Sequence, residues 1–102
     1  GATAIPVHSL DIVFIVNTLV QTHNRYAVLD EAHRVLKDKG RCVIVDWTKK
    51  GLTFGPVDEQ FVNFDELIKY ATTHGFTVQE TFQAGPYHTG MVLYKIPEGG
   101  RT

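Results

Sequence analysis

The stretch Ile12-Val13-Phe14-Ile15-Val16, together with the later stretch Cys42-Val43-Ile44-Val45, decides the fold of this chain. Both are short, continuous apolar runs rich in β-branched residues, which is typical of strands buried on both faces. Between them, apolar side chains at helical spacing predict a helix that opens near its N-cap Asn24 and runs to about Lys37. Gly40 suits the left-handed position that would close this helix. A strand, a helix and a strand at this spacing predict one right-handed parallel crossover unit.

The second half of the chain predicts another helix and a hairpin. Asn63 is a good N-cap with Glu66 three residues later, as in a capping box, and the helix ends at Gly75. Residues 76–84 alternate apolar and polar, so Phe76, Val78 and Phe82 are expected on one side of a half-exposed strand. Gly85-Pro86 then turns the chain into an antiparallel strand over residues 89–96. Residues 48–62 are expected to form a long loop.

Composition sets the broad class. Formal net charge is −1 and apolar content is 43%, which fits one ordinary globular domain. No basic stripe is present, so nucleic acid and anionic membranes are not expected partners. The apolar runs are too short to span a bilayer, no charged-then-apolar leader precedes them, and the expected location is the cytoplasm. The single cysteine, Cys42, excludes an intramolecular disulfide and a cysteine-based zinc site.

The order of these segments resembles the C-terminal half of a class I S-adenosylmethionine-dependent methyltransferase with a Rossmann-like fold. In this family the corresponding helix usually ends in the sequence "RVLKPGG". This chain has the same Arg-Val-Leu-Lys, which ends at Lys37, but Asp38-Lys39-Gly40 replaces Pro-Gly-Gly. The segments that carry the resemblance are Ala4–Val7, Asp11–Phe14 with Asn17 and Leu19, Leu29–Lys37, Val43–Trp47, Gly55-Pro56, Gly75-Phe76 and the closing hairpin. Residues 1–102 then form a single truncated methyltransferase-like domain.

The resemblance implies an α/β fold: half of a three-layer, Rossmann-like sheet. Its four strands would take the contiguous block 4-5-7-6 of the family sheet, the last one antiparallel, with two helices on one face. The glycine-rich turn after the family's first strand and the acidic residue after its second strand have no counterpart here. What remains of the cofactor site is the wall at the end of the fourth strand, where the resemblance implies that Asn17 and Thr18 are the cofactor-binding residues. S-adenosylmethionine is therefore expected as a cofactor when a partner half completes the domain, and otherwise none.

The helices in this pattern cover one sheet face and leave the other bare. Strands about 4.8 Å apart, each some 6 residues of about 3.3 Å, give this face an area of about 400 Å². Burial at about 25 cal/mol/Å² corresponds to about 10 kcal/mol, as much as the whole stability of a small domain. We therefore expect a homodimer, formed through the uncovered face or through the edge of the first strand. The loop over residues 48–62 and a separate N-terminal half are alternative covers.

Candidate site residues lie where the predicted strands end. His23, Asp46, Trp47 and His88 are expected along one rim, which in the resembling enzymes lines the substrate pocket. Methyl transfer needs mainly alignment, with a base when the nucleophile carries a proton, and the two histidines and Asp46 are candidates for that base. The alternative is that Asn17 and Asp46 cap strand ends and that the histidines are solvated. A metal site built from two histidines and one carboxylate has no spacing to support it, so no metal is expected.

Two functions stay open, and the sequence leaves catalytic residues unassigned. The first is a methyltransferase-like domain that is not competent alone, self-associates and has a possible small-molecule pocket. The second is an active S-adenosylmethionine-dependent methyltransferase acting on a small molecule, completed by an N-terminal half that is supplied in trans or was removed from this chain. Both depend on fold-level resemblance, which does not by itself establish activity.

Overall fold

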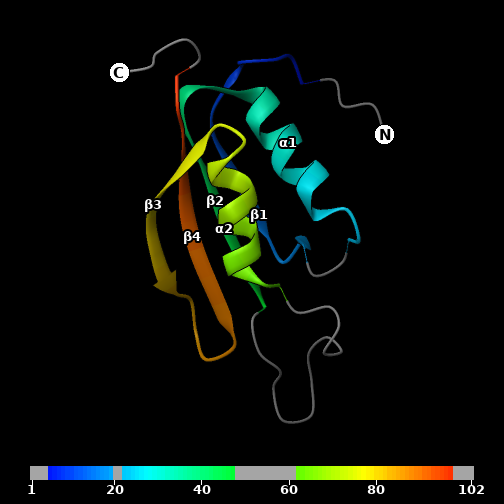
Figure 1. Ribbon diagram of the computed structural model, residues 1–102, viewed down its shortest axis with the longest axis vertical. Helices are drawn as coiled ribbons and strands as arrows, with labels where there is room; N and C mark the ends of the chain where they lie inside the picture. The colour runs from blue at the N-terminus through cyan, green and yellow to red at the C-terminus, as the bar shows by residue number, and fades with distance from the viewer. Residues whose placement is uncertain (1–4, 20–21, 48–61, 98–102) are drawn as a thin grey trace.

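The computed structural model describes residues 5–19, 22–47 and 62–97. The sheet has the order β1-β2-β4-β3, in which β1 is parallel to β2, and β4 is antiparallel to β2 and β3. This arrangement confirms the predicted α/β fold class and strand order (Figure 1). The predicted loop lies outside the described residues except for Val62. In chain order the elements are β1 (Leu10–Val16), α1 (Arg25–Val35), β2 (Leu36–Trp47), α2 (Phe64–Thr72), β3 (Phe76–Gln83) and β4 (His88–Lys95).

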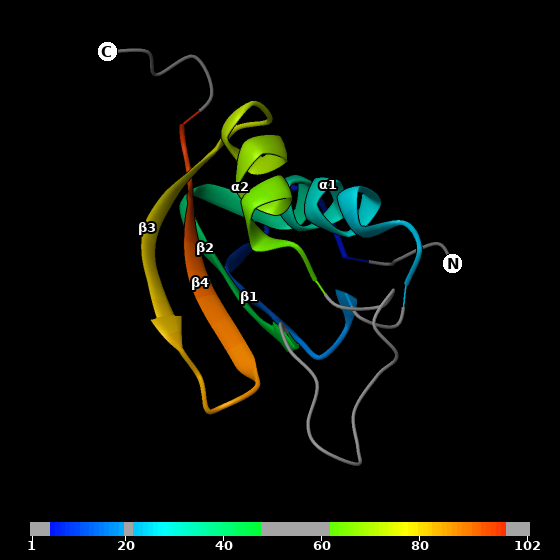
Figure 2. The same cartoon turned by 60° about the horizontal axis from the view of Figure 1, so that its bottom comes forward.

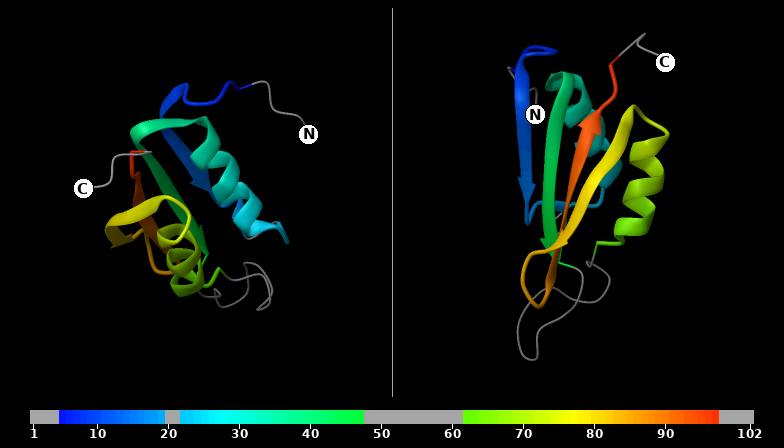
Figure 3. Two further views of the ribbon diagram at one scale, coloured as in Figure 1. Left: turned by 45° about the horizontal axis from the view of Figure 1, so that its top comes forward. Right: turned by 90° about the vertical axis from the view of Figure 1, so that its left-hand side faces the viewer.

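Both helices cover the same face of the sheet, as predicted. Figures 1 and 2 show α1 and α2 side by side over one face, and Figure 3 shows the sheet from two further directions. The core lies between this helix layer and the sheet. Its buried members are Ile15, Leu19, Leu29, Ala32, Leu36, Cys42, Ile44, Val62, Leu67, Ala71, Phe76, Met91 and Leu93.

The end of α1 differs from the prediction. The helix stops at Val35, and β2 starts at the next residue, Leu36, whose backbone is extended. Lys39, with φ 71°, has the left-handed conformation that the sequence assigns to Gly40. Glycine is required at position 40 for a different reason, since a Cβ there would lie 2.8 Å from the carbonyl oxygen of Lys37. The expectation that Gly40 closes the helix was therefore wrong.

A buried lysine satisfies carbonyl groups at this end of α1. Lys95 is fully buried at the end of β4. Its Nζ donates to the carbonyl oxygen of His33 at 2.6 Å and to that of Leu36 at 2.7 Å. The last carbonyl groups of a helix have no partner within the helix itself, so these bonds supply what the helix end lacks. The same bonds tie α1 to the central part of the sheet.

The predicted capping box at the start of α2 is confirmed for its Asn63 half. Asn63 Oδ1 accepts a hydrogen bond from the backbone N–H of Glu66 at 3.1 Å. After the helix, Gly75 has φ 95°, a left-handed conformation that favours glycine. A side chain at this position would also collide with the imidazole of His33. Gly75 therefore lets the chain turn from α2 into β3 directly against α1.

A β-bulge changes which face β3 presents. Its register with β4 shifts between Val78 and Glu80. Val78 pairs with Leu93 and packs against the core, whereas Phe82 pairs with Gly90 on the other face and fills the space beside that glycine. The expectation that Phe82 shares a side with Phe76 and Val78 was wrong, because the extra residue of a bulge reverses the alternation beyond it.

We expect Lys95→Met to lower the free energy of unfolding by about 1–3 kcal/mol, because the two carbonyl acceptors would stay buried without a donor. Urea unfolding followed by circular dichroism measures the change. Lys69→Met, at an exposed position on α2, is the control and should leave the midpoint unchanged. Equal midpoints for Lys95→Met and the unchanged chain would contradict the stabilising role of Lys95.

Candidate functional site

The carboxyl ends of β1 and β2 meet at one edge of the sheet because the two strands are parallel. The start of β4 joins them there, with His88 paired to Trp47 at the end of β2. We call this edge the carboxyl rim. The chain leaves β1 through Asn17, whose φ is 56° and whose N–H donates to the carbonyl oxygen of Val45 at 2.8 Å. Thr18 Oγ1 donates to the carbonyl oxygen of Val16 at 3.2 Å.

Asp46 lies beneath the rim and is fully buried on the helix side of β2. Its Oδ2 accepts a hydrogen bond from the backbone N–H of Leu19 at 2.8 Å, and its Oδ1 accepts one from the N–H of Trp47, also at 2.8 Å. A carboxylate that accepts from backbone N–H groups is a strong, charge-assisted acceptor. These contacts let Asp46 position Leu19, just beyond the end of β1.

Trp47, Tyr87 and His88 form an aromatic cluster at the rim. The ring centroids of Trp47 and His88 lie 4.3 Å apart, and those of Trp47 and Tyr87 lie 6.3 Å apart with planes 20° from parallel. All three side chains are partly exposed. An exposed cluster of this kind can contact a planar ligand, and it also shields the end of the β2–β4 ladder.

His23 lies apart from this cluster, on the helix side of the rim. It lines a depression of about 170 Å³ between the start of α1 and the start of α2. The other lining residues are Asn24, Arg25, Tyr26, Asn63, Glu66 and Leu67. Arg25 Nε donates to the carbonyl oxygen of Leu19 at 2.7 Å, which fixes the guanidinium beside this depression. We call it the helix-start depression.

The described residues offer no metal centre or reactive thiol. Residues 5–19, 22–47 and 62–97 contain no group of three or more His, Cys, Asp or Glu side chains able to hold a metal ion. Burial raises the pKa of the Cys42 thiol to about 12, so at neutral pH it stays protonated. Nor does any described helix have the length and apolar character needed to cross a membrane.

A family model described as "Methyltransferase domain" matches residues 2–44. The solved structure of an S-adenosylmethionine-dependent methyltransferase from Aquifex aeolicus matches with a TM-score of 0.79 and 23% identity, over 92% of this chain and 50% of that chain. A protein from Sulfolobus solfataricus, described as a type 11 methyltransferase, is 29% identical with a TM-score of 0.77, over 97% of this chain and 57% of that one.

The chain thus resembles methyltransferases in the sequence of residues 2–44 and shares its fold with S-adenosylmethionine-dependent methyltransferases. It spans only about half the length of these two solved structures. A further structure, from Listeria monocytogenes, shares the fold at 12% identity with a TM-score of 0.72, over 91% of this chain and 64% of that one. No curated protein sequence matches the chain.

The outer edge of β1 is a second notable surface of this methyltransferase-like domain. β1 is the end strand of the sheet among the described residues. On the face away from the helices, Ile12, Phe14 and Val16 are 46%, 64% and 50% exposed. Such a row of large apolar side chains on an edge strand is unusual for a stable free surface. We call these three residues the β1 stripe.

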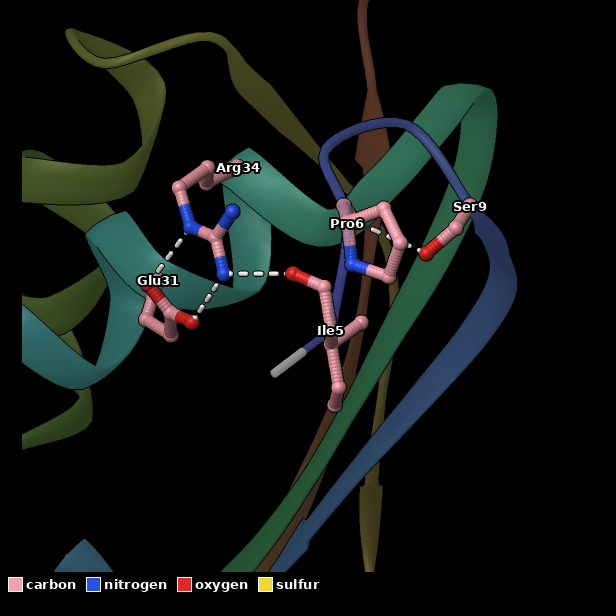
Figure 4. Close-up of polar contacts among 5 residues, drawn as sticks. All are labelled: Ile5, Pro6, Ser9, Glu31 and Arg34. Carbon is pink, nitrogen blue, oxygen red and sulfur yellow. Dashed lines mark hydrogen bonds and ion pairs between the residues drawn. The ribbon is translucent and has the colours of Figure 1, made fainter. Parts of the chain in front are cut away.

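On the helix side, the same edge borders an apolar groove of about 220 Å³. It is lined by Ile5, Leu10, Val13, Ile15, Val28, Glu31, Ala32 and Val35. Figure 4 shows how the segment at its end is held: Arg34 Nη2 donates to the carbonyl oxygen of Ile5 at 2.9 Å and to Glu31 Oε2 at 2.7 Å. Ser9 Oγ also donates to the carbonyl oxygen of Pro6 at 2.7 Å. The Arg34 hydrogen bond lowers the pKa of Glu31.

The structure brings together some of the residues predicted for the site and separates others. Trp47 and His88 are in contact, whereas Asp46 is buried and accepts a hydrogen bond from the backbone N–H of Trp47. His23 lies in the helix-start depression instead, so the four residues do not share one wall. Sequence reasoning missed Arg25 and Tyr87. The position of Arg25 next to the predicted N-cap was the available signal, whereas the contact between Tyr87 and Trp47 requires the register of β2 with β4.

Asp46→Asn tests the positioning role of the buried carboxylate. The side-chain amide would place a second donor against the N–H of Leu19 or Trp47, so we expect the free energy of unfolding to fall by about 1–3 kcal/mol. Urea unfolding measures this loss, and amide chemical shifts should change at Leu19 and Arg25. Asp38→Asn, at an exposed position on β2, is the matched control. Unchanged shifts at Leu19 would contradict the assignment.

Proposed function

We propose that this domain supplies the acceptor side of an S-adenosylmethionine-dependent methyltransferase for a small molecule and does not bind the cofactor without a completing half. The observation that carries the proposal is the outer edge of β1, with which no other strand of the described residues pairs. In the family order, the strand beyond this edge leads into the glycine-rich turn. The β1 stripe and the apolar groove flank that edge on its two faces. Together they offer apolar surface to a further strand and to the segments packed beside it.

The residues of this chain alone do not fit the cofactor. The cofactor supplies an electrophilic methyl group, and its polar ends need several donors and acceptors. At the end of β1, the Asn17 N–H and the Thr18 hydroxyl both donate to backbone carbonyl groups of the sheet edge. Residues 1–102 resemble the family's fourth to seventh strands, whereas the glycine-rich turn and the ribose-binding acid follow its first and second strands. A completing half, in the same polypeptide or in another, would supply those groups.

Binding of S-adenosylhomocysteine tests this proposal. We expect isothermal titration of residues 1–102 to give no heat at micromolar ligand. A chimera should bind with micromolar affinity when the preceding half of the Sulfolobus solfataricus protein is joined to residues 1–102, because its strand and turn complete the site at β1. Micromolar binding by residues 1–102 alone, or a folded chimera that binds nothing, would contradict the proposal. The same chimera carrying Phe14→Lys is the control for docking at β1.

We further propose that residues 1–102 self-associate through the β1 edge when no completing half occupies it. Two antiparallel copies of β1 related by a two-fold axis at Val13 would place Ile12 opposite Phe14. Such aromatic and β-branched pairs stabilise antiparallel strands. Asp11, the charged residue of the strand, would then face Ile15 and not another carboxylate. This register therefore joins apolar side chains without opposing like charges.

Light scattering after size exclusion tests self-association at low micromolar concentration. We expect residues 1–102 to elute as a dimer and Phe14→Lys to elute as a folded monomer, because a charge would interrupt the β1 stripe. Ile96→Lys is the control: Ile96 is 40% exposed but follows β4, which β2 separates from β1. A monomeric unchanged chain would contradict the β1-edge dimer.

A further inference from the structure

Three aromatic rings join α1 to α2 in a single stack. Tyr26 belongs to α1 and Tyr70 to α2, and their ring centroids lie 4.1 Å apart with planes 5° from parallel. His74, just after α2, stacks on the same Tyr70 ring, with centroids 3.8 Å apart and planes 13° from parallel. Two rings this close to Tyr70 and nearly parallel to it cannot share one of its faces, because they would overlap each other. The Tyr70 ring therefore lies between Tyr26 and His74.

The middle ring of the stack is held by its hydroxyl group. Tyr70 Oη donates to the two carboxylate oxygens of Asp30 on α1, at 2.7 Å and 2.9 Å. This hydrogen bond raises the pKa of Tyr70, because an ionised Tyr70 would face the Asp30 carboxylate, so the phenol remains a neutral donor at physiological pH. Asp30, Tyr70 and His74 thus form one chain of contacts from α1 to the end of α2.

Hydrogen bonding also fixes where the imidazole of His74 takes up a proton. Its Nδ1 lies 2.8 Å from the carbonyl oxygen of Tyr70. A carbonyl oxygen can only accept, so Nδ1 carries the hydrogen, and the further proton taken up in acid goes to Nε2. His74 is exposed to solvent, and it follows the last turn of α2, where a positive charge is favoured by the partial negative charge of the helix end.

Other titratable groups lie near this stack. Glu66 and Lys69 of α2 line a depression of about 510 Å³ beside the two tyrosines. The imidazole of His33, on α1, packs against Gly75, the residue after His74. Of these side chains, histidine alone normally changes charge between about pH 5 and pH 8. His33 is therefore the competing group, and a variant of His74 has to separate the two responses.

We propose that His74 is a proton-sensitive contact that controls how tightly α2 is held to α1. A cation over the face of an aromatic ring is attracted to it, so protonation of His74 tightens its stack on Tyr70, and deprotonation loosens it. Tyr70 transmits the change to α1 through Asp30 and Tyr26. Tyr26 also lines the helix-start depression, on the helix side of the carboxyl rim. The contact does not rest on the proposed function, since it needs neither the cofactor nor a completing half.

Hydrogen exchange of residues 1–102 tests the tightening. The Thr73 N–H donates to the Tyr70 carbonyl oxygen at 3.2 Å, so its exchange reports opening at the end of α2. We expect the protection factor of this amide to be about two- to fivefold higher at about pH 5.5 than at about pH 7.5, and equal at both in His74→Gln. Equal protection in the unchanged chain, or a difference that persists in His74→Gln, would overturn the proposal.

Carbon-13 NMR of the Asp30 carboxyl group tests the path to α1. This carbon should shift as His74 titrates. Tyr70→Phe should remove the shift but keep the pH effect at Thr73, because the stack remains while the bond to Asp30 is lost. His23→Gln is the control, because His23 is another exposed imidazole but lies at the helix-start depression, and it should change neither measurement. An Asp30 shift that survives in Tyr70→Phe, or effects that disappear in His23→Gln, would refute the path through Tyr70.

Discussion

The whole arrangement depends on α1 being tied to the sheet at both ends by a buried charged side chain. Asp46 accepts the N–H of Leu19 in the segment that leads into α1, and Lys95 donates to the carbonyl groups of His33 and Leu36 at its other end. Each charge faces backbone groups of the opposite polarity, which offsets the cost of taking it out of water. Because both anchors stand in central strands, the helix layer and the rim are fixed by the same pair of contacts.

The two faces of the sheet are built differently. The helix face is closed by apolar packing, whereas the opposite face keeps the β1 stripe half-exposed and relies on side chains of the sheet itself elsewhere. On that face, Arg41 lies 5.0 Å over the ring of Tyr94 and its Nε donates to Gln79 Oε1 at 2.9 Å. The side of the sheet next to β3 is thus partly covered by polar and aromatic contacts, and the apolar surface that is left gathers at β1.

The sequence was sufficient for the elements whose signals are local. Continuous apolar runs identified β1 and β2, and the capping residues located the start of α2. It was insufficient where a distant strand decides the outcome. The bulge that turns Phe82 to the other face depends on the register of β3 with β4, and the burial of Lys95 depends on carbonyl groups far away in the chain. For the same reason, His23 and His88 follow strand or loop ends in the sequence yet lie on different sides of the rim.

Trp47 is the single tryptophan of the chain, and it lies beside His88 and Tyr87 at the carboxyl rim. The wavelength of its indole fluorescence therefore reports the polarity around the carboxyl rim and does not respond to the far end of the sheet. Rearrangements of the hairpin between β3 and β4 would change this fluorescence, so no dye has to be attached. The domain thus carries its own spectroscopic label at the place where its chemistry is expected.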